Sequence, residues 1–120
     1  GDTTVIENTD YSLVHDFTLG EATLDKTFDL IWCTEFLEHV EEKYVPNYMP
    51  LFEKGKMAVV TAAPPGWPGH HHVNCREESY WIDVFKNYGL RYNEELTNEF
   101  KSLSQMRKNF FKRAGMVFLK

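Results

Sequence analysis

Two short segments of the chain concentrate side chains that bind metals or transfer protons. The segment TEFLEHV contains Glu35, Glu38 and His39, and the segment GHHHVNC contains the consecutive histidines His70–His72. Carboxylates combined with imidazoles favour Mg²⁺, Mn²⁺, Fe²⁺ or Zn²⁺ over softer metals. If the two segments meet in the fold, the chain has the donors for a divalent metal site.

The spacing within the first segment predicts a shared direction for its side chains. Glu35, Glu38 and His39 are separated as i, i+3 and i+4, which places them on one face if the segment is helical. Thr34 is a suitable N-cap for such a helix. The alternative is that Glu38 and His39 only cap a turn or touch a substrate, and that His70–His72 form a polar loop facing solvent.

The elements that would position these residues follow an α/β order. The apolar runs FDLIWC (28–33) and KMAVVTAA (56–63) each predict a buried parallel strand. Between them, Pro46 predicts the first turn of a short helix that ends near Lys54. Ligands of open α/β sheets bind at the carboxyl ends of the strands. Both metal-binding segments follow such an end, so we expect them at one edge of the sheet.

Five further segments complete the predicted order. Apolar residues at three- and four-residue spacing predict a helix over 76–89, closed by a glycine. The other expectations are a short strand at 11–17, another within 90–96, mixed and partly helical structure over 94–113, and a terminal strand at 115–120. The chain is therefore predicted to be one α/β domain.

Composition sets the class of protein. The chain has 120 residues, 42% of them hydrophobic and 15% aromatic, which suits one domain with a packed core. Its opening is polar and acidic, without the features of a signal peptide, so we expect a cytoplasmic protein with no membrane partner. Cys33 and Cys75 belong to no CxxC pair. Because Cys33 falls on an apolar strand, a buried and unreactive thiol is expected there rather than a nucleophile.

Charge is distributed unevenly along the chain. Residues 1–60 contain 12 acids and 4 basic side chains, a balance of −8, whereas residues 61–120 contain 6 acids and 9 basic side chains, a balance of +3. The segment RKNFFKR (107–113) mixes basic and aromatic residues, as single-stranded nucleic-acid binders do. The alternative for this segment is an amphipathic surface helix.

The run FDLIWCTEFLEHV resembles a segment of the class I S-adenosylmethionine-dependent methyltransferases. The resemblance continues in order through KMAVVTAA, HHVN and YWIDVFKNYGL, over roughly residues 11–93, and GMVFLK suits the last strand of that fold. It implies a Rossmann-like sheet with helices on both faces, and S-adenosylmethionine as cofactor. In that family an acid at the position of Asp16 faces the adenine amino group. The residues that the resemblance places beside the cofactor are Asp16, Phe17, Trp32, Cys33 and Thr34.

Part of that family carries an ExxEH element with metal-ligating roles. It comprises the small-RNA 3′-terminal 2′-O-methyltransferases and, similarly, the ubiquinone-pathway O-methyltransferases; in the RNA group a later histidine joins the element. The resemblance implies a site for Mg²⁺ or Mn²⁺, with His70 or His71 replacing the last ligand if the loop is built differently. Its four implied ligands are Glu35, Glu38, His39 and His72.

The resemblance also implies roles in the reaction. Glu35 and His39 are the expected catalytic residues. Trp67, which lies in a Pro/Gly loop, and His71 are expected to face the substrate. The acceptor would be an oxygen or nitrogen of a small molecule or of a nucleic acid.

The chain departs from the family pattern in one respect. It has no GxGxG turn, and no acid for the ribose unless Glu7 or Asp10 serves. We therefore expect residues 1–120 to form a single partial methyltransferase domain, truncated on its N-terminal side. Its cofactor half would lie on a second chain or another copy, or the cofactor is no longer bound.

The sequence is therefore compatible with three functions. The first is a metal-assisted methyltransferase. The second is a non-catalytic, methyltransferase-like partner or oligomerising subunit that binds no cofactor. The third is a metal-dependent hydrolase that uses the same glutamates and histidines around an activated water.

Overall fold

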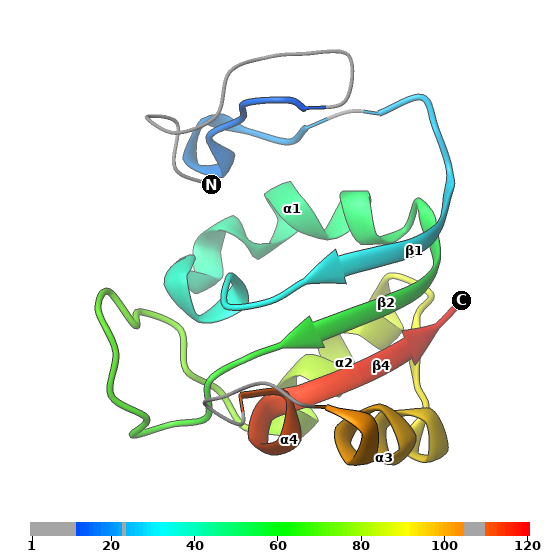
Figure 1. Ribbon diagram of the computed structural model, residues 1–120. Coiled ribbons are helices and arrows are strands. Elements are labelled where there is room, and N and C mark those ends of the chain that lie inside the picture. The colour runs from blue at the N-terminus through cyan, green and yellow to red at the C-terminus, as the bar shows by residue number, and fades with distance from the viewer. Residues whose placement is uncertain (1–11, 23, 105–109) are drawn as a thin grey trace.

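A four-stranded mixed sheet forms the centre of an α/β domain in the computed structural model, which describes residues 12–22, 24–104 and 110–120 (Figure 1). The sheet order is β1-β2-β4-β3. Its strands are β1 (Phe28–Cys33), β2 (Gly55–Thr61), β3 (Arg91–Tyr92) and β4 (Gly115–Leu119). β1 and β2 are parallel, whereas β4 runs antiparallel to both β2 and β3.

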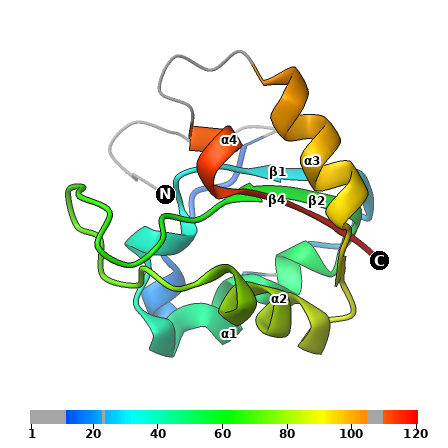
Figure 2. The same ribbon diagram turned by 90° about the horizontal axis from the view of Figure 1, so that it is seen from below.

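Helices lie on both faces of this sheet (Figure 2). One face carries α1 (Val45–Phe52) and α2 (Glu78–Asn87), and the other carries α3 (Glu94–Leu103) and α4 (Phe110–Ala114). Because side chains alternate along a strand, Ala58 and Val60 of β2 enter the main core with α1 and α2. Val59 enters a smaller cluster with Phe111 and Val117 on the opposite face.

The helices predicted from the spacing of apolar residues and from prolines are confirmed. Pro46 lies in the first turn of α1, and Gly55, just after this helix, begins β2. In α2 the fully buried side chains are Trp81 and Phe85, four residues apart. The turn after α2 contains Gly89 at φ 84°, a conformation that glycine adopts without strain.

Two predicted elements are wrong. Of the strand predicted over 11–17, Ser12 forms a single β-bridge, residues 13–16 form no strand, and residue 11 lies outside the described ranges. A 3-10 helix, η1 (Phe17–Leu19), follows, and the Thr18 amide donates to the Asp16 side chain at 2.9 Å to cap it. No α-helix begins at Thr34. The chain instead makes two 3-10 turns, η2 (Leu37–His39) and η3 (Glu42–Tyr44).

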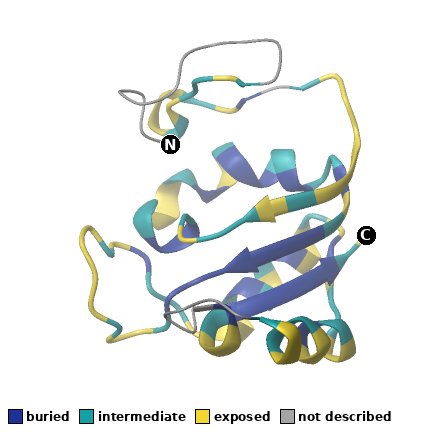
Figure 3. Ribbon diagram, viewed as in Figure 1, coloured by how far each residue is buried: buried dark blue, intermediate teal, exposed yellow. Residues whose placement is uncertain are grey.

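β1 is parallel to β2, as predicted, but it is not buried (Figure 3). Its apolar side chains Phe28, Leu30 and Trp32 are exposed by 36%, 47% and 58%. On the face that carries these three side chains, α3 packs on β4 and α4 packs on β4 and β2. α4 reaches β1 through Phe111, which stacks on Trp32, and this contact leaves the three side chains largely exposed. No helix in the described ranges is long and apolar enough to cross a membrane.

Candidate metal centre

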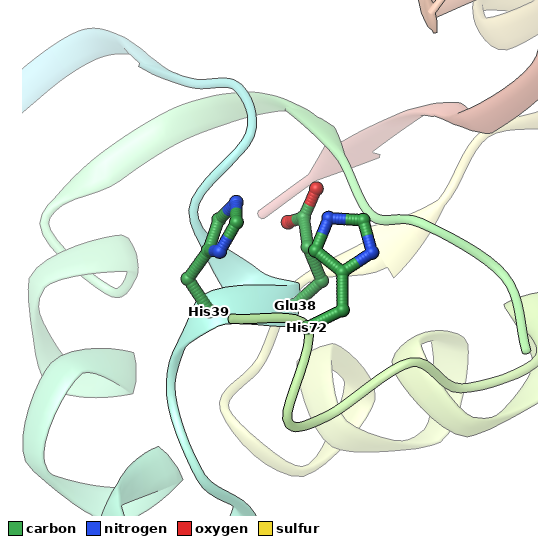
Figure 4. Close-up of side chains that lie close together, drawn as sticks. All are labelled: Glu38, His39 and His72. Carbon is green, nitrogen blue, oxygen red and sulfur yellow. The ribbon is translucent and has the colours of Figure 1, made fainter. Parts of the chain in front are cut away.

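Glu38, His39 and His72 bring one potential metal-ligating atom each to within 4.8 Å of one another (Figure 4). Glu38 and His39 belong to η2, which follows β1, and His72 belongs to the loop between β2 and α2. Figure 4 shows the three side chains directed toward the same space between the two loops. The prediction that the two segments meet at one edge of the sheet is confirmed.

Main-chain hydrogen bonds join the two loops beside these side chains. The amides of Val73 and Asn74 both donate to the carbonyl of Glu38, at 2.9 and 3.1 Å. Since β1 and β2 are parallel neighbours, their carboxyl ends already lie side by side. The two bonds then fix the histidine loop directly onto the η2 turn.

Each histidine is oriented by a main-chain carbonyl. His39 Nδ1 lies 3.0 Å from the carbonyl oxygen of His71, and His72 Nδ1 lies 3.0 Å from that of Trp67. A carbonyl oxygen only accepts, so Nδ1 carries the proton in both rings. The Nε2 lone pair of each ring is thereby free to ligate a metal, the arrangement that outer partners impose on metal-binding histidines.

Glu38 supplies the charge of the site. Its side chain is 3% exposed, and its Oε2 has no hydrogen-bond partner in the described part of the chain. A buried carboxylate oxygen without a partner costs free energy unless a cation or a proton satisfies it. The carboxylate and the two free Nε2 atoms therefore form a donor set that suits a divalent cation.

These groups face a cavity of about 180 Å³. Three protein ligands leave further coordination positions for water or a substrate, as in catalytic rather than structural metal sites. Gly69 is part of the cavity wall, and a Cβ at this position would overlap the His72 ring. Other residues in the wall are Glu35, Thr61, Trp67 and His70.

Left-handed backbone marks both loops. In the described ranges, the non-glycine residues with positive φ are Glu35 at 52° and His71 at 55°. This conformation costs about 1–2 kcal/mol per residue and persists where other contacts enforce it. The Glu35 amide donates to Thr61 Oγ1 at 2.8 Å, and the His71 carbonyl accepts from His39.

Glu35 does not join the other three predicted ligands. It lies in the cavity wall, but its side chain is exposed and falls outside the group of atoms within 4.8 Å. The prediction that one helical face presents Glu35, Glu38 and His39 is therefore wrong, because Glu35 adopts a left-handed turn before η2 begins.

The two predicted substrate-facing residues occupy different cavities. Trp67 lines the metal cavity, and the Arg113 guanidinium lies 4.4 Å from the centre of its ring. The exposed His71 lines an adjoining cavity of about 130 Å³. His39 lines both cavities.

The residues predicted to border a cofactor do not converge. Asp16 and Phe17 line the adjoining cavity. Trp32 and Cys33, which are consecutive on β1, point to opposite faces of the sheet. Trp32 stacks on Phe111 with ring centroids 6.2 Å apart, and Cys33 packs against the main core. Thr34 is among the lining residues of neither cavity.

Burial determines the chemistry of Cys33. Burial, together with the smaller effect of the nearby Glu38 carboxylate, raises the pKa of the thiol to about 12. The thiol therefore stays protonated at neutral pH, as expected for an unreactive cysteine. Both cysteines are free thiols.

Two residues of the site were not predicted from the sequence. Thr61 ends β2 and accepts the Glu35 amide, and Gly69 gives the His72 ring its space. Their signals were a polar residue at the carboxyl end of a strand and a glycine beside the histidines. Glu7, Asp10 and part of the 107–113 segment lie outside the described residues.

No protein-family model matches this chain, and no curated protein or solved structure is significantly similar to it.

Proposed function

We propose that this domain binds a divalent metal ion through Glu38, His39 and His72 and uses it in S-adenosylmethionine-dependent methyl transfer to an oxygen or nitrogen acceptor. The observation that carries the metal assignment is the unpartnered, buried Oε2 of Glu38 beside two histidines whose Nδ1 atoms are already engaged. Mg²⁺ and Mn²⁺ are the expected metals.

A metal at this position would lower the pKa of an acceptor hydroxyl and hold it in one orientation. The residues of the chain would do the rest. Glu38, His39 and His72 would hold the ion. The catalytic role of His39 would thus be that of a metal ligand. Glu35, exposed in the cavity wall, would accept the proton that the acceptor releases. Trp67 would contact the acceptor.

The adjoining cavity supports a place for the methyl donor. Asp16 offers a carboxylate to an exocyclic amine, and Phe17 offers a ring to an adenine. Because His39 lines both cavities, a ligand in one lies next to a metal held in the other. This cavity is not lined by Trp32, Cys33 or Thr34.

The sheet is consistent with the methyltransferase resemblance. Its last strand, β4, is antiparallel and lies between β2 and β3. The resemblance likewise assigns GMVFLK to the last strand of that fold. We propose that the domain is a Rossmann-like methyltransferase domain.

Calorimetric titration with S-adenosylmethionine tests this function. The parent protein loaded with Mn²⁺ should bind the cofactor, and Asp16→Asn should weaken that binding, with Asp29→Asn, a β1 carboxylate outside the cavity, as the matched control. Absence of binding at millimolar cofactor would contradict the methyltransferase assignment. It would favour the non-catalytic partner, which light scattering would then detect as an oligomer or a complex.

The ligand types support a second candidate function, that of a metal-dependent hydrolase. Two histidines and one glutamate with open positions are also the ligands of catalytic zinc in hydrolases. Turnover of an ester or amide by the metal-loaded protein without S-adenosylmethionine would support this candidate instead.

A further inference from the structure

An ion pair joins the two segments that carry the metal ligands. Arg76 Nη2 lies 2.5 Å from Glu42 Oε2. Glu42 begins η3, three residues after His39, and Arg76 follows His72 by four residues. The pair therefore connects the chain just after one ligand segment to the chain just after the other.

Both side chains of this ion pair form a further hydrogen bond. Arg76 Nε donates to Asn74 Oδ1 at 2.8 Å, and the Tyr80 hydroxyl donates to Glu42 Oε1 at 3.2 Å. The guanidinium also lies 5.0 Å from the centre of the Tyr80 ring. Asn74 is buried, and its main-chain N–H is one of the two that donate to the Glu38 carbonyl. The contacts thus form a closed path from the η2 turn to the histidine loop.

An exposed ion pair contributes little to folding stability. The side chains of Arg76 and Glu42 are 41% and 57% exposed, so stability alone does not explain so many converging contacts. A metal site, in contrast, needs its ligands held to within about 0.5 Å. In the described part of the chain, the other polar contacts between the two segments are the two amide bonds to the Glu38 carbonyl and the His39 bond to the His71 carbonyl.

We propose that Glu42 and Arg76 are positioning residues that set the distance between the Glu38–His39 turn and His72, and thereby the metal affinity of the site. This inference rests on the proposed metal site. Neither residue touches the metal; each acts by fixing one of the two ligand-bearing segments against the other.

Substitution separates positioning from simple electrostatics. Near a bound cation, loss of the Glu42 charge weakens binding and loss of the Arg76 charge strengthens it, if charge alone matters. Positioning predicts that Glu42→Gln and Arg76→Gln both weaken binding, each by about tenfold, the lower end of the range for an outer partner. Arg76→Lys keeps the charge but loses the fork to Glu42 and Asn74. It should therefore weaken binding nearly as much as Arg76→Gln.

Two comparisons complete the design. The double variant Glu42→Gln/Arg76→Gln should have the same Mn²⁺ affinity as whichever single variant binds Mn²⁺ less tightly, because both changes break the same ion pair. Asp29→Asn and Lys56→Gln serve as controls. They remove the exposed ion pair between β1 and β2, whose charged atoms are 3.4 Å apart at the amino ends of these strands, away from the site. Both controls should bind the metal as the parent does.

The experiment is a calorimetric titration of Mn²⁺ into the full chain and each variant. Melting temperatures of the metal-free proteins are measured alongside and should move by less than about 5 °C. The proposal is confirmed if all three single variants weaken binding and the double variant is not additive. Tighter binding by Arg76→Gln, or parent-like binding by Arg76→Lys, would overturn it and leave the metal site intact. A parent protein that binds no Mn²⁺ would overturn both.

Discussion

The imidazoles of His39 and His72 lie with ring centroids 4.9 Å apart, and both rings turn Nδ1 to a main-chain carbonyl and leave Nε2 free. They come from different loops at the ends of two parallel strands. The carboxylate of Glu38, a residue that is only 3% exposed, completes the group. Ligand geometry is thus encoded by loop contacts that do not involve a metal, and substitutions in those contacts can be tested one at a time.

Glu38 should stabilise the metal-bound protein and destabilise the metal-free one. Glu38→Gln removes a buried charge that has an unpartnered oxygen, so the free energy of unfolding in EDTA should rise by about 1–2 kcal/mol. In saturating Mn²⁺ the order of the two proteins should reverse, because the variant loses the binding energy. Urea unfolding with and without the metal measures both quantities.

Glu35→Gln is the control for this effect, since Glu35 is exposed in the same cavity wall. Its stability in EDTA should remain within about 0.5 kcal/mol of the parent. A Glu38→Gln protein that is less stable than the parent in EDTA would show that the carboxylate has a structural partner.

Gly69 should be required for the position of His72. The methyl group of Gly69→Ala would overlap the imidazole, so the ring must move and Mn²⁺ affinity should fall by about tenfold. Gly66→Ala adds the same group to the same loop, where it meets no atom within 4 Å. That control should lose about 1 kcal/mol of stability from its positive φ and keep its metal affinity. Equal affinities for both variants would contradict the assignment of His72.

Thr61 should couple stability to metal binding. Thr61→Val removes the acceptor for the Glu35 amide and should lower the free energy of unfolding by about 1–2 kcal/mol. Because the turn that precedes Glu38 is then released, Mn²⁺ affinity should fall as well. Thr97 is an equally buried threonine whose Oγ1 accepts the Val117 amide away from the site. Thr97→Val should cost similar stability without any change in affinity, and equal affinities in the two variants would count against this role of Thr61.

Cys33 should make the fold sensitive to alkali. Its folded pKa is about 12, above the value near 8.5–9 of an unfolded thiol. Above pH 9 the unfolded state therefore releases a proton that the folded state retains. The thiol should therefore not lower the free energy of unfolding below pH 9. As pH rises from 9 toward 12, the free energy of unfolding should fall by up to about 1.4 kcal/mol per pH unit. Cys33→Ala should show a shallower slope in urea unfolding between pH 8 and 11, and identical slopes would contradict this account.

Local patterns were sufficient to predict most elements of the fold. The apolar runs of β1, β2 and β4 and the periodic face of α2 each carry their own signal. The burial of β1 could not be predicted in this way, because it depends on where α3 and α4 pack. An apolar strand has the same sequence whether or not a helix covers it.

The site was predicted by residue type and misplaced by geometry. Parallel strand ends correctly brought Glu38, His39 and His72 together. Glu35 was expected on a helix that does not form, because its left-handed backbone depends on Thr61, a residue far away in the sequence. The Glu42–Arg76 pair is also long-range, and no local spacing indicates it.

Mn²⁺ binding by the parent, Glu38→Gln, His72→Ala and His70→Ala proteins tests the central claim most directly. His70 lies in the same cavity wall but outside the ligand group, so His70→Ala is the matched control. We predict one Mn²⁺ per chain for the parent and for His70→Ala, and at least about 100-fold weaker binding for the other two. A parent that binds no ion, or Glu38→Gln and His72→Ala proteins that bind it as the parent does, would contradict the metal site and the chemistry proposed for it.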